Sequence, residues 1–121
     1  MKNILWIGIA FFLLSFSCDV ENELATDLMS LEDQINRLSE SVSCTNSSEW
    51  KFTAMGSKPC GGPARYIAYH QSVEKDFLEL VNQYTEQQKA YNQKTGAISD
   101  CAIVSPPRSV MCEGGKAFLL F

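Results

Sequence analysis

Apolar residues recur along this chain at two periods, and each period predicts one type of element. From residue 24 to 42 they are spaced alternately by four and three residues, which predicts a helix with a single apolar seam. The same rhythm returns after Ser72, a favourable N-cap, and stops before Gly96, a favourable left-handed stop. We therefore expect a second helix that reaches Lys94. The first seam consists of Leu24, Leu28, Leu31, Ile35, Leu38 and Val42.

Shorter runs predict strands. Residues 50–55 alternate between apolar and polar positions and form either a short strand or an irregular segment. Residues 64–70 are rich in aromatic and β-branched residues, which predicts a strand. Two further runs, 108–112 and 116–121, flank Glu113-Gly114-Gly115 and have the signature of a hairpin. We predict an α+β fold in which two amphipathic helices pack on a small antiparallel sheet with a C-terminal hairpin, stapled by disulfides.

The seam over 24–42 allows two arrangements. Charged residues stand between its apolar positions, as a coiled coil requires, so the helix could form a homo-oligomer and make the protein a structural spacer. Alternatively, the seam packs on the rest of the same chain, and the second seam downstream favours this arrangement.

The N-terminus has the three-part layout of a secretory signal. Lys2 supplies a positive charge, an uninterrupted apolar run follows, and the small residues Ser15 and Ser17 precede Cys18. The apolar run is shorter than the roughly 20 residues that cross a bilayer as a helix. We therefore predict a signal peptide over 1–17, whose removal from the 121 residues would leave a chain of one-domain size.

A cysteine directly after such a cleavage point resembles the lipobox of bacterial lipoproteins, in which the thiol is acylated. Here Ser15 stands where the strict pattern has leucine, and Leu14 lies one position further from Cys18. This looser form is similar to the lipoprotein signals of Bacteroidota. The resemblance implies that lipid on Cys18 anchors the protein to a membrane of the bacterial cell envelope. Of these membranes, the outer membrane is the one we expect. A plain secretory signal would instead release a soluble protein.

Residues 18–23 separate the predicted anchor from the predicted domain. They are acidic and polar, so we expect a solvated tether. They also resemble the acidic export signals of some surface lipoproteins, and both surface display and periplasmic retention stay open. Residues 24–121 then form a single α+β domain, made of the helix over 24–42 and a cysteine-stapled core over 44–121.

Five cysteines in an exported chain leave one over, and lipid on Cys18 would account for it. The other four form an even set, for which structural disulfides are the simplest interpretation in an oxidising compartment. Three pairings are possible, and we expect the one that joins sequence neighbours, Cys44–Cys60 with Cys101–Cys112. No two form a Cys-x-x-Cys pair, so the spacing disfavours zinc and thiol-redox chemistry, and we predict no cofactor.

One stretch of the chain resembles a group of small exported bacterial proteins of uncharacterised activity. It runs from Lys58 through Cys60-Gly61-Gly62-Pro63 to Tyr69, and the resemblance extends to Tyr91-Asn92 and Ser99-Asp100-Cys101. It implies a shared disulfide-stapled fold and contributes no activity. Members of the group tend to carry further cysteines, near the places where this chain has Trp50 and Phe118, so their bridge pattern does not transfer.

Charge and the single histidine narrow the function classes. The net charge is −4 and the isoelectric point is near 4.9, so without a basic patch nucleic acid is not an expected partner. His70 is the only histidine, and each cysteine that could act beside it as a nucleophile is expected in a bridge. We predict a non-enzymatic protein, with a small hydrolase that uses His70 as the alternative.

The leading hypothesis is a cell-envelope lipoprotein that presents a small binding or inhibitor-like domain to an unknown protein partner. Aromatic and arginine side chains dominate binding hot spots, which directs attention to the strand after the Gly-Gly turn. Packing of its tyrosines in the core is the alternative. The expected contact surface is the rigid Cys60–Pro63 turn with Arg65, Tyr66 and Tyr69.

Overall fold

The computed structural model describes residues 17–121, with side chains from residue 20 onward. In this part of the chain, no helix combines the length and the hydropathy needed to cross a membrane. Two short 3-10 turns, η1 (Ser47–Glu49) and η2 (Gln71–Val73), come directly before the first strand and the second helix. The main elements in chain order are α1 (Ser17–Ser39), β1 (Trp50–Met55), β2 (Arg65–His70), α2 (Glu74–Thr95), β3 (Ser109–Glu113) and β4 (Lys116–Leu120).

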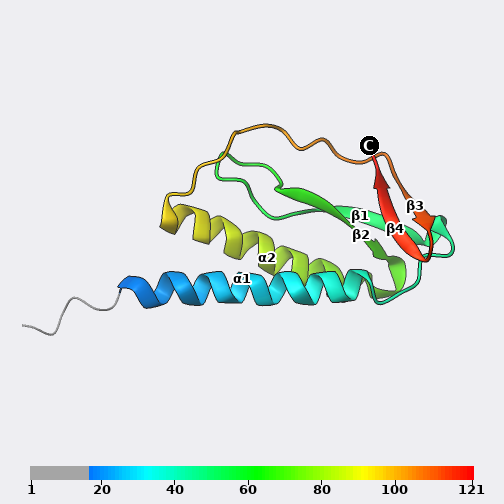
Figure 1. The fold of residues 1–121 in the computed structure, drawn as a ribbon, viewed down its shortest axis with the longest axis horizontal. Helices are drawn as coiled ribbons and strands as arrows, with labels where there is room; N and C mark the ends of the chain where they lie inside the picture. The colour runs from blue at the N-terminus through cyan, green and yellow to red at the C-terminus, as the bar shows by residue number, and fades with distance from the viewer. Residues whose placement is uncertain (1–16) are drawn as a thin grey trace, which may run out of the picture.

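The two helices lie side by side, and the β1–β2 hairpin lies over them (Figure 1). The β3–β4 hairpin sits at the end of the molecule where α1 ends. The predicted α+β class with a C-terminal hairpin is confirmed, with the strands divided into two antiparallel pairs, β1–β2 and β3–β4. The main core lies between the two helices and the β1–β2 hairpin. It contains Leu28, Leu31, Ile35, Met55, Ile67, Tyr69, Phe77, Val81 and Tyr84.

The seam of α1 is buried within the same chain. Ile35 has no exposed surface, and Leu28 and Leu31 are 9% and 8% exposed, packed in one cluster with α2. Of the two arrangements open to this seam, packing on the second amphipathic helix is therefore the one the chain adopts. Oligomerisation through the same residues would require opening the core.

The first helix begins and ends earlier than the expected 24–42. Within the described residues it runs from Ser17, so the residues expected to form a tether, 18–23, are helical. No glycine or proline interrupts this stretch. The helix ends at Ser39, and Ser41 donates from both its backbone N and its hydroxyl to Leu38 O.

The expected N-cap of the second helix is wrong. Ser72 lies inside the 3-10 turn η2, and α2 begins at Glu74 after Val73, which makes no side-chain capping bond. The reason is His70, whose ring nitrogen Nδ1 accepts a hydrogen bond from Ser72 N at 3.1 Å and caps the 3-10 turn. The expected stop at Gly96 is confirmed, because its φ of 64° is left-handed.

The four cysteines form two bridges, Cys44–Cys112 and Cys60–Cys101, so the expected pairing of sequence neighbours is wrong. Cys44 N donates to Gly115 O at 2.8 Å, which fixes the loop after α1 against the β3–β4 turn and brings Cys112 to Cys44. The bridges are nested, and each joins segments that are far apart in sequence. Two such disulfides indicate an oxidising, extracytoplasmic environment.

Part of the predicted N-terminal signal lies outside the described residues. The structure does not describe residues 1–16, and it describes no side chain for Ser17 or Cys18. The predicted signal peptide and the predicted lipidation of Cys18 therefore stay predictions.

Candidate functional site

The candidate site is the segment 97–107, here called the stapled segment, which joins α2 to β3 and contains neither helix nor strand. It runs back along the length of α2 on the side of the molecule away from α1 (Figure 1). A helix of 22 residues is about 33 Å long, and eleven extended residues reach only about 36–40 Å. The reach of the stapled segment is therefore only slightly greater than the length of the helix beside it.

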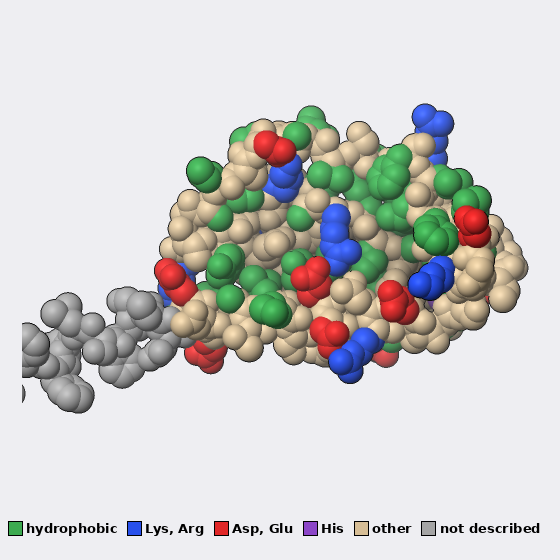
Figure 2. All heavy atoms as spheres, viewed as in Figure 1, with side chains coloured by type: hydrophobic (Ala, Val, Ile, Leu, Met, Phe, Trp, Pro, Cys, Tyr) green, Lys and Arg blue, Asp and Glu red, His purple; other side chains and the backbone are tan. Residues whose placement is uncertain are grey.

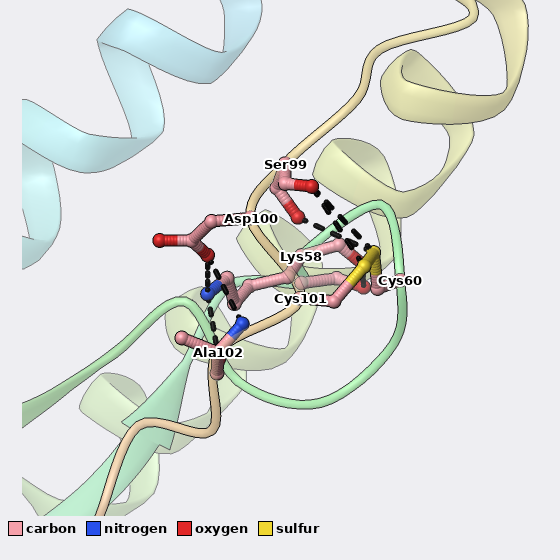
Figure 3. Close-up of a disulfide and its surroundings, with 7 residues drawn as sticks. Lys58, Cys60, Ser99, Asp100, Cys101 and Ala102 are labelled. Carbon is pink, nitrogen blue, oxygen red and sulfur yellow. Dashed lines mark hydrogen bonds and ion pairs between the residues drawn. A yellow bond between two sulfur atoms is a disulfide. The ribbon is translucent and has the colours of Figure 1, made fainter.

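Two contacts fix the middle of the stapled segment to the loop after β1 (Figure 3). The Cys60–Cys101 disulfide is the first. The second is the ammonium of Lys58, which lies 2.8 Å from Asp100 Oδ1 and donates to Ala102 O at 2.7 Å. The Lys58 side chain is only 16% exposed, so this cation is largely committed to holding the segment.

The segment bends at its fixed point. Ala102 N donates to Asp100 Oδ1 at 3.1 Å, a local turn of the kind that aspartate side chains favour. Cys101 between them has a φ of 56°, which for a residue other than glycine requires support from its surroundings. Hydrogen bonding to Lys58 holds the pKa of the Asp100 carboxyl below its ordinary value, so the carboxylate acceptor persists into acid.

Two isoleucines flank this fixed point, and both point into solvent. Ile98 is 94% exposed and Ile103 is 92% exposed, more than any other large hydrophobic residue in the described part of the chain. Fully burying such a side chain would gain about 1.5–3 kcal/mol. The fold leaves this gain unused at both positions, on a segment whose backbone is held in place, so a partner that covered either side chain would obtain it at little cost in chain entropy.

The residues expected to form the contact surface are only partly available. Tyr69 is 4% exposed and stacks on Phe77 with ring centroids 4.8 Å apart, so for this residue the core alternative is correct. Burial raises the pKa of its phenol. Arg65 is paired with Glu32 on α1 at 3.0 Å, and Tyr66 is half-buried edge-on to Phe52. The Cys60–Pro63 turn remains exposed for the most part, beside the stapled segment.

The His70 ring lies between two polar side chains, Ser72 and Glu49, and is within hydrogen-bonding distance of both. Its Nδ1 is 2.7 Å from the Ser72 hydroxyl and its Nε2 is 3.3 Å from Glu49 Oε2. Because Ser72 N donates to Nδ1, the neutral ring carries its proton on Nε2, which then donates to Glu49. The order carboxylate, imidazole, hydroxyl matches that of a serine hydrolase, although capping of the 3-10 turn also accounts for the contacts with Ser72.

An open groove of about 730 Å³ lies between residues 39–43 and 114–118, with Trp50 on its wall. Two of its serine hydroxyls are already used within the chain, Ser39 donating to Ala68 O and Ser41 to Leu38 O. The indole Nε1 of Trp50 makes no hydrogen bond within the described chain and is shielded from solvent. Glu40, Ser43 and Lys116 also line the groove.

Comparison with known proteins adds no assignment. No protein-family model, curated protein or solved structure matches this chain. Within residues 17–121, no three His, Cys, Asp or Glu side chains lie together as metal ligands would.

Sequence reasoning missed Lys58, Ile98 and Ile103. Ile98 and Ile103 flank Cys101 in a stretch without a helix or strand period, so no pattern in the sequence distinguishes them from buried residues.

Proposed function

We propose that this protein is an exported, lipid-anchored binding protein without enzymatic activity, and that the stapled segment is its contact surface. The observation that carries the proposal is the exposure of Ile98 and Ile103 on a segment fixed by a disulfide and by Lys58. Such a segment loses little conformational entropy when it binds, so its apolar contacts translate into affinity.

The anchor is proposed on the sequence alone. The N-terminal signal and the cysteine at position 18 support acylation, and the two bridges support export, since both need an oxidising compartment. In this proposal α1 continues directly from the lipidated residue, so the domain stands on the membrane of the cell envelope through a helix.

Site-specific photocrosslinking in intact cells tests the binding function. A photoreactive amino acid at Ile103 should give a discrete protein adduct, because this side chain lies on the proposed contact surface. The matched control is Met29, a 72% exposed apolar residue on α1. An adduct from position 103 and none from position 29 is the expected result. The same pattern from both positions, or none from either, contradicts the proposal.

A small hydrolase remains the second candidate, favoured by one specific observation, the Glu49–His70–Ser72 contacts. In this reading Ser72 is the nucleophile and His70 its base, which takes the hydroxyl proton. The test is hydrolysis of a p-nitrophenyl ester by the wild type and by Ser72→Ala, with unfolding by urea as a check on the fold. A wild-type rate equal to that of S72A removes this candidate.

A further inference from the structure

We infer that the stapled segment binds in the active-site cleft of an endopeptidase with an apolar primary pocket, as a substrate-like inhibitor with Ile103 in that pocket. This inference rests on the proposed binding function and names the class of its partner. It is carried by three features of the segment: the free backbone of residues 103–105, the exposure of Ile103, and the attachment of the chain on both sides.

The backbone of residues 103–105 is free to pair. Within residues 17–121, none of their N–H and C=O groups makes a hydrogen bond, whereas the flanking Ala102 O and Arg108 N are both bonded. Two prolines follow at 106 and 107, which favour an extended conformation in the residues before them. An extended stretch with unpaired backbone groups is what a peptide-binding cleft recognises by adding a strand.

The side chains of this stretch alternate as those of a bound strand do. Ile103 and Ser105 are exposed, and Val104 between them is half-buried against the protein. Ile103 therefore projects away from the domain, where a pocket of a partner can enclose it. A pocket that takes this side chain is an apolar one, which sets the class of endopeptidase.

The chain is held to the domain on both sides of the Ile103–Val104 bond. This attachment is what makes the segment an inhibitor and not an ordinary substrate, because the two ends would stay in place after cleavage. Hydrolysis of this bond would consume one water and leave a carboxylate on Ile103 and an amine on Val104. On the first side, Cys101 stays bridged to Cys60 and Ala102 stays bonded to Lys58. On the second side, Pro107 is buried and Arg108 N donates to Leu120 O at 2.6 Å. The new ends cannot leave, so religation competes with release.

The test is inhibition of two purified serine endopeptidases, one of elastase-type and one of subtilisin-type specificity, by the full-length protein in detergent. Hydrolysis of a chromogenic peptide is followed for the wild type, Ile103→Asp and the matched control Met29→Asp. Circular dichroism confirms that the variants fold. Inhibition of at least one enzyme by the wild type and by M29D, weakened about tenfold or more in I103D, is the expected result.

Failure of this inference is distinguishable from failure of the binding function. Absence of inhibition by the wild type, or equal inhibition by I103D and M29D, overturns the inference. If crosslinking from position 103 persists in that case, the binding function stands and the partner belongs to another class. If crosslinking from position 103 is also absent, both proposals fall.

Discussion

Gly56 and Gly96 both have a positive φ, yet their surroundings differ. Gly56 (φ 78°) is buried after β1, and a Cβ there would collide with Gln88 Oε1 and come within 3.0 Å of Ala64 Cβ. The Gln88 oxygen cannot easily withdraw, because it accepts a hydrogen bond from Ser57 N at 2.7 Å. Gly96 (φ 64°) closes α2 with nothing within 4 Å of such a Cβ.

We predict that Gly96→Ala lowers the free energy of unfolding by about 1–2 kcal/mol, the cost of left-handed backbone for alanine. Gly56→Ala carries the same backbone cost and adds overpacking, typically about 1–3 kcal/mol more. Urea unfolding followed by circular dichroism measures both losses. Equal losses for the two variants would show that the space around Gly56 is not limiting.

Lys58 acts on the titration of Asp100. The hydrogen bond between them lowers the Asp100 pKa, so we predict that Lys58→Met returns this pKa toward its ordinary value. A carboxyl whose pKa is depressed by folding stabilises the folded state above its unfolded-state pKa. That stabilisation is lost as the pH falls through the folded-state pKa. NMR titration of the Asp100 carboxyl carbon gives the pKa directly, and an unchanged value in K58M contradicts the assigned cause.

The two bridges differ in their access to solvent, at the scale of the elements they join. Cys60 and Cys101 are both exposed, whereas Cys44 is 3% exposed beneath the β3–β4 hairpin. Because thiol attack requires access to a sulfur, we predict that limited reductant opens Cys60–Cys101 before Cys44–Cys112. Alkylation of the freed thiols followed by mass mapping gives the order. Simultaneous opening, or Cys44–Cys112 first, contradicts it.

Elements with a clear period were predictable, and contacts between distant residues were not. The α1 seam follows from local spacing, because one face of that helix is apolar. The bridge partner of Cys44 depends on the Cys44–Gly115 contact, which has no local signature. The capping role of His70 was equally hidden, since Ser72 is by itself the better capping residue.

The candidate site was predictable only in its general place. The exposed Cys60–Pro63 turn does lie at the site, because Cys60 holds the stapled segment. Both interpretations were open for Tyr69, since an aromatic residue on a strand suits a core and a contact surface equally well until burial is known. Ile98 and Ile103 lie in a stretch without period, where sequence gives no measure of exposure.

At the scale of the whole molecule, α1 and α2 run in opposite directions, so the end of α2 lies near the start of α1 (Figure 1). With lipid on Cys18, the stapled segment would begin at the membrane end and climb to the β3–β4 hairpin at the far end. Figure 2 shows hydrophobic side chains gathered on the visible face at that far end, over the β3–β4 hairpin. In that arrangement Ile103 would stand further from the membrane than Ile98.

The Cys60–Cys101 bridge fixes the stapled segment, and an acylated Cys18 would anchor the domain. Non-reducing peptide mapping by mass spectrometry on the protein isolated from its own envelope reads both in one experiment. We predict crosslinked peptides for Cys44–Cys112 and Cys60–Cys101, and an acylated Cys18 at the mature N-terminus. Peptides joining Cys44 to Cys60, or free thiols at Cys60 and Cys101, would contradict the account of a preorganised contact segment.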